Sequence, residues 1–130
     1  MPATDLPIAG RVINEVAWTT GGLWLRFWPP GPEYGLHIEG AFQIVAGGIG
    51  RRHDPRSPDA TWFGLCGRNI TMARAGDDGG LTIQFSDGSG LLVPPDEFEA
   101  WQLAGEDGEL FVSVAGGGFA AWQRRVPPKG

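Results

Sequence analysis

The sequence contains few of the residues that build covalent or metal-held sites, with one cysteine and two histidines among 130 residues. Cys66 alone cannot form an internal disulfide, which is typical of a protein in a reducing compartment. Zinc sites need three or four His, Cys or acidic ligands, and neither His37 nor His53 has partners at ligand spacing. We therefore expect no disulfide, no metal and no cofactor.

Long hydrophobic runs are also missing. No segment approaches the roughly 20 apolar residues that a membrane helix needs. The first residues, MPATDLP, lack the basic start and the apolar run of a secretory signal. We expect a cytoplasmic protein that does not contact a membrane.

Positive charge is scarce and uneven. The chain has 10 Lys and Arg residues against 15 Asp and Glu, a formal net charge of -5, and its only lysine is Lys129. Residues 77–109 contain nine carboxylates and no Lys or Arg. Proteins that bind nucleic acid carry a clustered basic surface, so this distribution disfavours that class and favours a basic partner.

Helical periodicity is absent, and 22 glycines and 11 prolines make long helices improbable. Alternation of apolar and polar residues is frequent instead, as in Leu81-Thr82-Ile83-Gln84-Phe85, and is typical of half-buried strands. Gly-Gly and Asp-Gly pairs between these segments suit tight hairpins. We predict ten strands, near 10–18, 22–28, 34–39, 41–46, 67–75, 80–86, 90–93, 99–104, 109–115 and 118–123, with a short helix at 95–101 as the alternative there.

The sequence also contains an internal repeat. Residues 8–46 align with residues 65–104, with Gly10-Arg11 on Gly67-Arg68 and Gly21-Gly22-Leu23 on Gly79-Gly80-Leu81. A segment without periodicity, 47–61, separates the copies and reads as a linker loop, and 109–123 reads as a closing hairpin. The whole chain, 1–130, is expected to form one all-β domain, a duplicated antiparallel meander in a compact sandwich or a partly open barrel.

Two clusters are candidate binding residues. If Leu23, Leu25 and Phe27 face the core, then Trp24, Arg26 and Trp28 share the opposite face, and Trp with Arg is enriched at binding hot spots. The alternative is a strand that is covered on both faces. Arg51 and Arg52 in the linker can bind an acidic partner, or can dock on the acidic hairpins of the same chain.

The carboxylates give a second set of tentative binding residues. Asp77 and Asp78 fall at a predicted hairpin tip, where their turn propensity alone explains them. Glu97 and Glu99 share one face of a predicted strand, as a general acid and base would have to. Cys66 has no histidine placed to serve as a base and is expected to pack, and His37 is expected on the surface beside Glu39. We assign no catalytic residue.

The order of motifs in the second half adds a resemblance. Phe98-Glu99-Ala100-Trp101 is followed by an Asp107-Gly108 turn, an aliphatic strand, Gly116-Gly117-Gly118 and Ala121-Trp122. The chain resembles, over about residues 6–123, a family of small actinobacterial proteins classed as a domain of unknown function. The resemblance implies an order of motifs and no activity; a likeness in style to immunity proteins is analogy alone.

The sequence leaves several functions open. The first hypothesis is a non-enzymatic, immunity-like binding protein whose acidic surface masks a basic partner. The second is a small-ligand binder that uses the interior of a barrel or the face of Trp24, Arg26 and Trp28. A hydrolase with Glu97 and Glu99 and a self-associating module with unpaired edge strands are the others.

Overall fold

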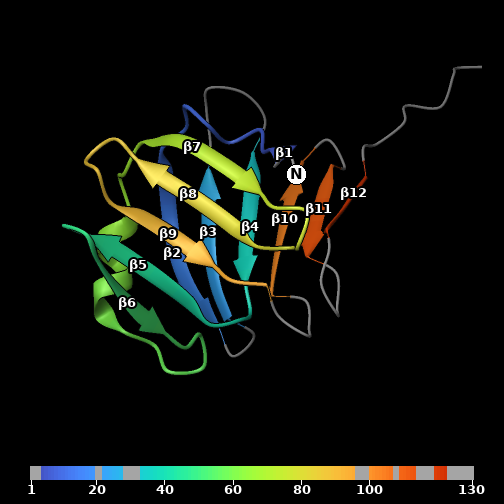
Figure 1. Cartoon of the computed structure of the whole chain (residues 1–130). Coiled ribbons are helices and arrows are strands. Elements are labelled where there is room, and N and C mark those ends of the chain that lie inside the picture. The colour runs from blue at the N-terminus through green and yellow to red at the C-terminus, as the bar shows by residue number, and fades with distance from the viewer. Residues whose placement is uncertain are drawn as a thin grey trace, which may run out of the picture.

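The computed structural model is a sandwich of two antiparallel six-stranded sheets, with the sheet orders β1-β7-β8-β9-β5-β6 and β12-β11-β10-β4-β3-β2. Figure 1 shows the two sheets stacked face to face. The structure describes residues 4–19, 22–27, 33–95, 100–106 and 109–113, and the backbone of 119–122. The prediction of an all-β sandwich is confirmed, and the two sheets do not close into a barrel.

Each sheet takes strands from both halves of the chain. The first sheet contains β1 (Thr4–Asp5), β5 (Phe42–Ala46), β6 (Ile49–His53), β7 (Ile70–Ala75), β8 (Leu81–Phe85) and β9 (Gly90–Val93). The second contains β2 (Ile13–Thr19), β3 (Gly22–Phe27), β4 (Tyr34–Ile38), β10 (Trp101–Gly105), β11 (Leu110–Ser113) and β12 (Phe119–Trp122). One short 3-10 helix, η1 (Ala60–Leu65), lies between β6 and β7 in the chain.

The core lies between the sheets and follows from the alternation in the sequence. Leu23, Leu25 and Phe27 of β3 are fully buried, as are Leu36 and Ile38 of β4. Leu81, Ile83 and Phe85 of β8 face them from the other sheet. Burial of these side chains supplies the main driving force that holds the two sheets together.

The halves exchange their fourth strands. β2, β3 and β4 form a meander, and the next strand, β5, crosses to the other sheet and pairs with β9. In the same way β7, β8 and β9 form a meander, and β10 crosses back and pairs with β4. The two crossing segments touch where Glu39 and Gly40 donate backbone hydrogen bonds to the Ala100 carbonyl. A sandwich built this way cannot be separated into two independent halves.

The segments that precede β2 and β7, the first strands of the two meanders, have equivalent backbone contacts. Gly10 donates to the Ile70 carbonyl and Gly67 donates to the Ile13 carbonyl, each at 2.7 Å. Both glycines have positive φ values, 85° and 88°, which only glycine adopts without strain. The segments 10–13 and 67–70 therefore hold each other in place across an approximate twofold arrangement.

The interpretation of 47–61 as a linker loop is wrong in two places. Residues 49–53 form β6, which pairs with β5 through the two-residue turn Gly47-Gly48. Both turn glycines have positive φ, 59° and 77°, as a tight hairpin of this kind requires. Alternation fails to reveal β6 because four of its five residues are exposed. Residues 60–65 form η1, which is the second departure from a loop. Among the described residues, no helix is long and apolar enough to span a membrane.

The ten predicted strands all have counterparts; β9 has the predicted bounds, and the others differ at one or both ends. The predicted strand at 99–104 is β10, which begins at Trp101, so the alternative helix at 95–101 does not extend to its predicted end; residues 96–99 lie outside the described residues. The tryptophans differ in depth. Trp62 and Trp101 are 2% and 1% exposed, whereas Trp18 is half-buried.

Candidate functional site

The candidate site lies on one side of the sandwich, formed by β5, β6, the loop 54–59 and η1, and is called the η1 side below. Asp59 begins η1 because its carboxylate accepts hydrogen bonds from the backbone N–H and the hydroxyl of Thr61, at 2.9 and 2.8 Å. These bonds, the backbone one first, lower the pKa of Asp59. The start of the helix is thereby fixed by its own cap.

Side-chain contacts attach this helix to the first sheet and the loop before it to the second. The Trp62 Nε1–H donates to His53 Nδ1 at 3.0 Å, and the Trp62 ring packs against Phe42 at 5.3 Å between centroids. The Trp18 Nε1–H donates to the Pro55 carbonyl, which ties the loop to β2. Because His53 Nδ1 accepts a hydrogen bond, the neutral ring carries its proton on Nε2. The η1 side is therefore preorganised by its own packing.

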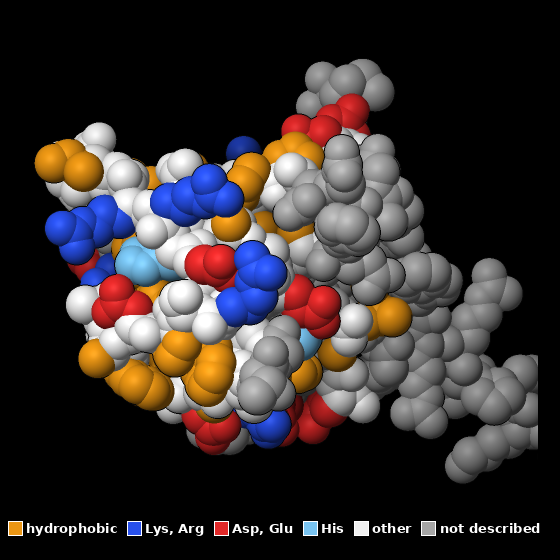
Figure 2. Space-filling model, turned by 90° about the horizontal axis from the view of Figure 1, so that it is seen from below, with side chains coloured by type: hydrophobic (Ala, Val, Ile, Leu, Met, Phe, Trp, Pro, Cys, Tyr) orange, Lys and Arg blue, Asp and Glu red, His pale blue; other side chains and the backbone are white. Residues whose placement is uncertain are grey.

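Two hollows flank η1. One has a volume of about 350 Å³ and is mainly apolar, with Arg51 and Arg68 at its wall. Its lining residues are Ile44, Ala46, Ile49, Arg51, His53, Thr61, Leu65 and Arg68. The other, of about 170 Å³, is lined by Trp18, Trp62, Phe63 and their neighbours. Figure 2 looks onto this side and shows groups of hydrophobic side chains next to arginine side chains.

The exposed apolar side chains concentrate here. Among the described residues, the two large hydrophobic side chains with high exposure are Ile49 at 70% and Phe63 at 57%. Both border the hollows beside η1. Each hollow therefore has one exposed apolar side chain at its border, which a partner can contact together with the apolar lining.

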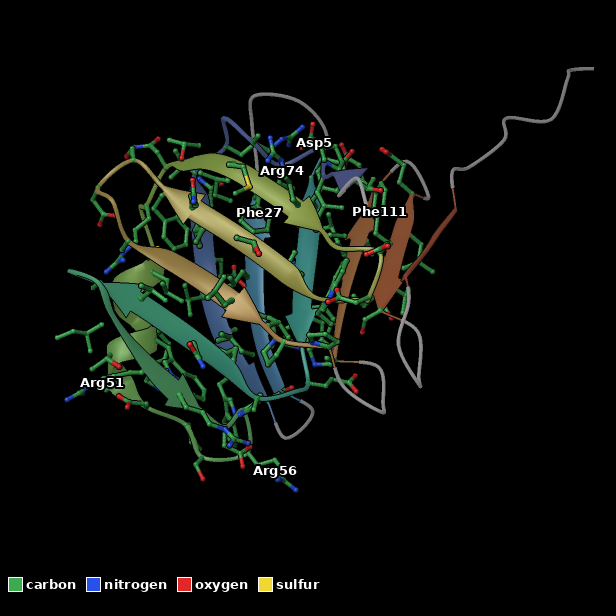
Figure 3. The ribbon with its side chains drawn as sticks, in the orientation of Figure 1. Asp5, Phe27, Arg51, Arg56, Arg74 and Phe111 are labelled. Atoms are coloured by element: carbon green, nitrogen blue, oxygen red, sulfur yellow. The ribbon has the colours of Figure 1, made fainter. Side chains whose placement is uncertain are left out.

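The positive charges of this side differ in how they are balanced. Arg56 pairs with Asp54, which lowers the pKa of Asp54 through its side-chain hydrogen bond. Arg68 donates to Ser89 Oγ at 2.6 Å and lies 3.6 Å from Asp87. Arg51 and Arg52 are exposed and form no ion pair within 4 Å with a described residue, although their charges help to lower the pKa of Asp59 and of Asp54, respectively. Figure 3 shows Arg51 at the margin of the molecule, above Arg56.

The predicted cluster of Trp24, Arg26 and Trp28 is not an open patch within the described residues. Trp24 is half-buried because its ring stacks on His37, at 4.1 Å and an interplanar angle of 9°. Arg26 is exposed but pairs with Glu15 and Glu33, at 3.6 and 3.4 Å. Trp28 lies outside the described residues. The covered-strand alternative fits Trp24 better than the open one.

The acidic residues do not gather at one place. Asp77 and Asp78 are exposed in the β7–β8 turn, where the Asp78 carboxylate accepts the Gly80 N–H at 2.9 Å. Asp87 lies in the separate β8–β9 turn, where hydrogen bonds from Ser89 lower its pKa. Glu97 and Glu99 lie outside the described residues. Among the described carboxylates, Asp5, Glu15, Glu33, Asp54 and Asp87 each lie within 4 Å of an arginine of the same chain, as Asp5 does with Arg74 (Figure 3).

Two expectations about single residues need correction. Cys66 is exposed at the end of η1, because the chain turns outward there toward Gly67 with positive φ, and does not pack in the core. His37 is only 12% exposed, because Trp24 covers its ring while Glu39 lies 3.2 Å from its Nδ1. No group of three His, Cys, Asp or Glu side chains suited to a metal occurs in the described part of the chain.

Sequence reasoning included Arg51 and Arg52 but missed Ile49, Phe63 and the hollows. The available signal was Gly47-Gly48, which can form a hairpin turn as well as begin a loop.

Comparison with known proteins shows the family of the chain but no activity. No curated protein and no solved structure shows significant similarity to it. The model of a family of unknown function, DUF6188, matches residues 4–123, and the chain belongs to this family.

Proposed function

We propose that this protein is a non-enzymatic binding protein that holds an acidic segment of a partner protein on its η1 side. The observation that carries the proposal is the combination of Arg51 and Arg52, which are exposed and have no ion pair within 4 Å among the described residues, with the exposed Ile49 and the apolar hollow beside it. Apolar contact supplies affinity at such sites, and unpaired charges select the partner. The proposal includes a cytoplasmic location, for which the single cysteine is the support.

A small ligand fits the same hollow less well. The hollow lies at the lower end of the usual size range for ligand pockets and is open rather than deep. Its polar groups do not converge, because Arg68 already contacts Ser89 and Asp87. A protein segment that lies along the surface can use both the exposed Ile49 and the arginines at once.

The masking of a basic partner by the acidic hairpins is the second candidate, because Asp77 and Asp78 are exposed and form no ion pair with a described residue. Immunity-like masking would be its concrete form. We rank it second because the turns that carry acidic residues lie at separate ends of strands, so fewer carboxylates can act together on one partner.

A charge-reversal experiment separates the two candidates. The probes are two extended peptides of valine and threonine, one with two successive central glutamates and the other with two lysines. We expect the wild-type protein to bind the glutamate peptide, and the Arg51→Glu plus Arg52→Glu variant to bind it at least about tenfold more weakly, because two attractions become repulsions. Isothermal titration at low and high salt measures the affinities.

Arg56→Glu is the matched control, because Arg56 is 84% exposed on the same side but pairs with Asp54. This variant is expected to retain nearly all of the affinity for the glutamate peptide. Preference of the wild-type protein for the lysine peptide, lost in an Asp77→Asn plus Asp78→Asn variant, would support masking by acidic hairpins instead. Binding of neither peptide would overturn both candidates.

A further inference from the structure

The two sheets have equivalent strands, but one sheet has an additional strand at its edge and the other does not. β5 and β6 in the first sheet correspond to β10 and β11 in the second, because β5 follows β9 in the sheet order as β10 follows β4. In the second sheet β12 pairs with the outer edge of β11. In the first sheet β6 is the last strand, so the position that corresponds to β12 has no strand among the described residues.

The backbone of β6 has hydrogen-bonding groups directed toward this open position. The two-residue turn makes Ala46 and Ile49 a hydrogen-bonded pair, and the pairing then alternates along the hairpin. Gly50 and Arg52 therefore point their N–H and C=O groups away from β5. No described residue other than those of β5 pairs with the β6 backbone. All four residues from Ile49 to Arg52 are exposed.

The side chains of β6 indicate what can add to it. Two copies of this strand would bring Arg51 and Arg52 together, and like charges on neighbouring strands are destabilising. The end of the same chain is unsuitable for the same reason, since Arg124, Arg125 and Lys129 are its charged residues. Gly50 leaves room for a second backbone, as a glycine within an edge strand commonly does.

Building on the proposed function, we infer that an extended acidic segment of the partner adds to β6 as an antiparallel strand, in the position that β12 occupies in the other sheet. The carboxylates of two successive residues in this segment lie opposite Arg51 and Arg52. Because opposite residues share a face, the carboxylate opposite Arg51 points toward the hollow beside Ile49, and the carboxylate opposite Arg52 points toward the outer face of the sheet. The inference names the binding mode and the sequence type of the partner.

The register follows from the second sheet. There Leu110, Phe111 and Val112 pair with Trp122, Ala121 and Ala120. Gly50, Arg51 and Arg52 take the corresponding places, since Val45 pairs with Gly50 as Ala104 pairs with Leu110. The partner residue opposite Gly50 has no facing side chain and accommodates a large aromatic group, which is a known way to stabilise an edge glycine.

Substitution of Gly50 tests strand addition separately from binding. Gly50→Pro removes one outward N–H, which β5 does not use, and places a ring where the incoming strand would lie. Gly50→Ala is the matched control, because it adds a Cβ but keeps the N–H. The added Cβ would come closest to the flexible end of Gln43, with Oε1 at 2.9 Å, and would make an ordinary contact with Val45 Cγ2 at 3.6 Å. Thermal unfolding of both variants verifies that each is folded.

The glutamate peptide described above is the probe. We expect Gly50→Pro to bind it about tenfold more weakly than Gly50→Ala, which should bind as the wild-type protein does. Amide hydrogen exchange should slow at Gly50 and Arg52 of the wild-type protein when the peptide is bound. Equal affinity of both variants, with unchanged exchange at Gly50 and Arg52, would overturn strand addition but leave binding on the η1 side intact. No binding by the wild-type protein would overturn both.

Discussion

Trp62→Ala is expected to lower the free energy of unfolding by about 4 kcal/mol, the typical cost of removing a buried tryptophan from a core. The Trp62 side chain is 2% exposed and packs against Phe42 and His53. Its loss also removes the donor to His53 Nδ1 and so leaves a largely buried acceptor without its partner. Urea unfolding followed by circular dichroism measures the change.

Phe63→Ala is the control for this prediction. Phe63 is adjacent in the chain and is also aromatic, but its side chain is 57% exposed. We expect this variant to lose less than about 1 kcal/mol, as is usual for an exposed position. The Trp62 variant should also lose affinity for the glutamate peptide, since Trp62 attaches η1 to β6. Equal small losses of stability in both variants would contradict the role of Trp62 as the anchor of the η1 side.

Gly22→Ala is expected to destabilise the protein by about 3 kcal/mol, which combines backbone strain with an overpacked contact. Gly22 opens β3 with a φ of 137°, a conformation that residues with a Cβ rarely adopt. A Cβ at this position would lie 2.3 Å from the Ile38 carbonyl oxygen of β4. Because the clash is with backbone, it cannot be relieved by a change of rotamer.

Gly64→Ala is the matched substitution. A Cβ on Gly64 would meet no atom within 4 Å, and its φ is not positive. We expect a change within about 0.5 kcal/mol. Thermal unfolding of the two variants side by side measures the difference, and a Gly22 variant as stable as the Gly64 variant would show that β3 and β4 lie farther apart than described.

Local patterns were sufficient to predict the strands with one buried face. In β8, apolar residues alternate with Thr82 and Gln84, and the buried face is the predicted one. β6 was missed for a physical reason. An edge strand that is exposed on both faces shows no alternation of apolar and polar residues. Its arginines are as compatible with a solvent-exposed loop as with a strand. Pairing with β5, rather than its own sequence, makes this segment a strand.

The exchange of β5 and β10 between the sheets was beyond sequence reasoning. A repeat fixes which strands are equivalent, but either fourth strand can pair within its own half or with the other half. The choice depends on contacts distant in the chain, such as those of Glu39 and Gly40 with Ala100. The hollows beside η1 were hidden likewise, because one forms where β5 and β6 meet η1 and the other where β2 and β3 meet η1.

The central claim is that the η1 side, and β6 in particular, is the binding surface. Titration of the isotope-labelled protein with the glutamate peptide, followed by backbone amide chemical shifts, tests this claim most directly. We predict the largest shift changes at Ile49–His53 and in η1, with little change in the β7–β8 turn at Asp77 and Asp78. Changes confined to that turn, or to the outer face of β8 at Thr82 and Gln84, would contradict it.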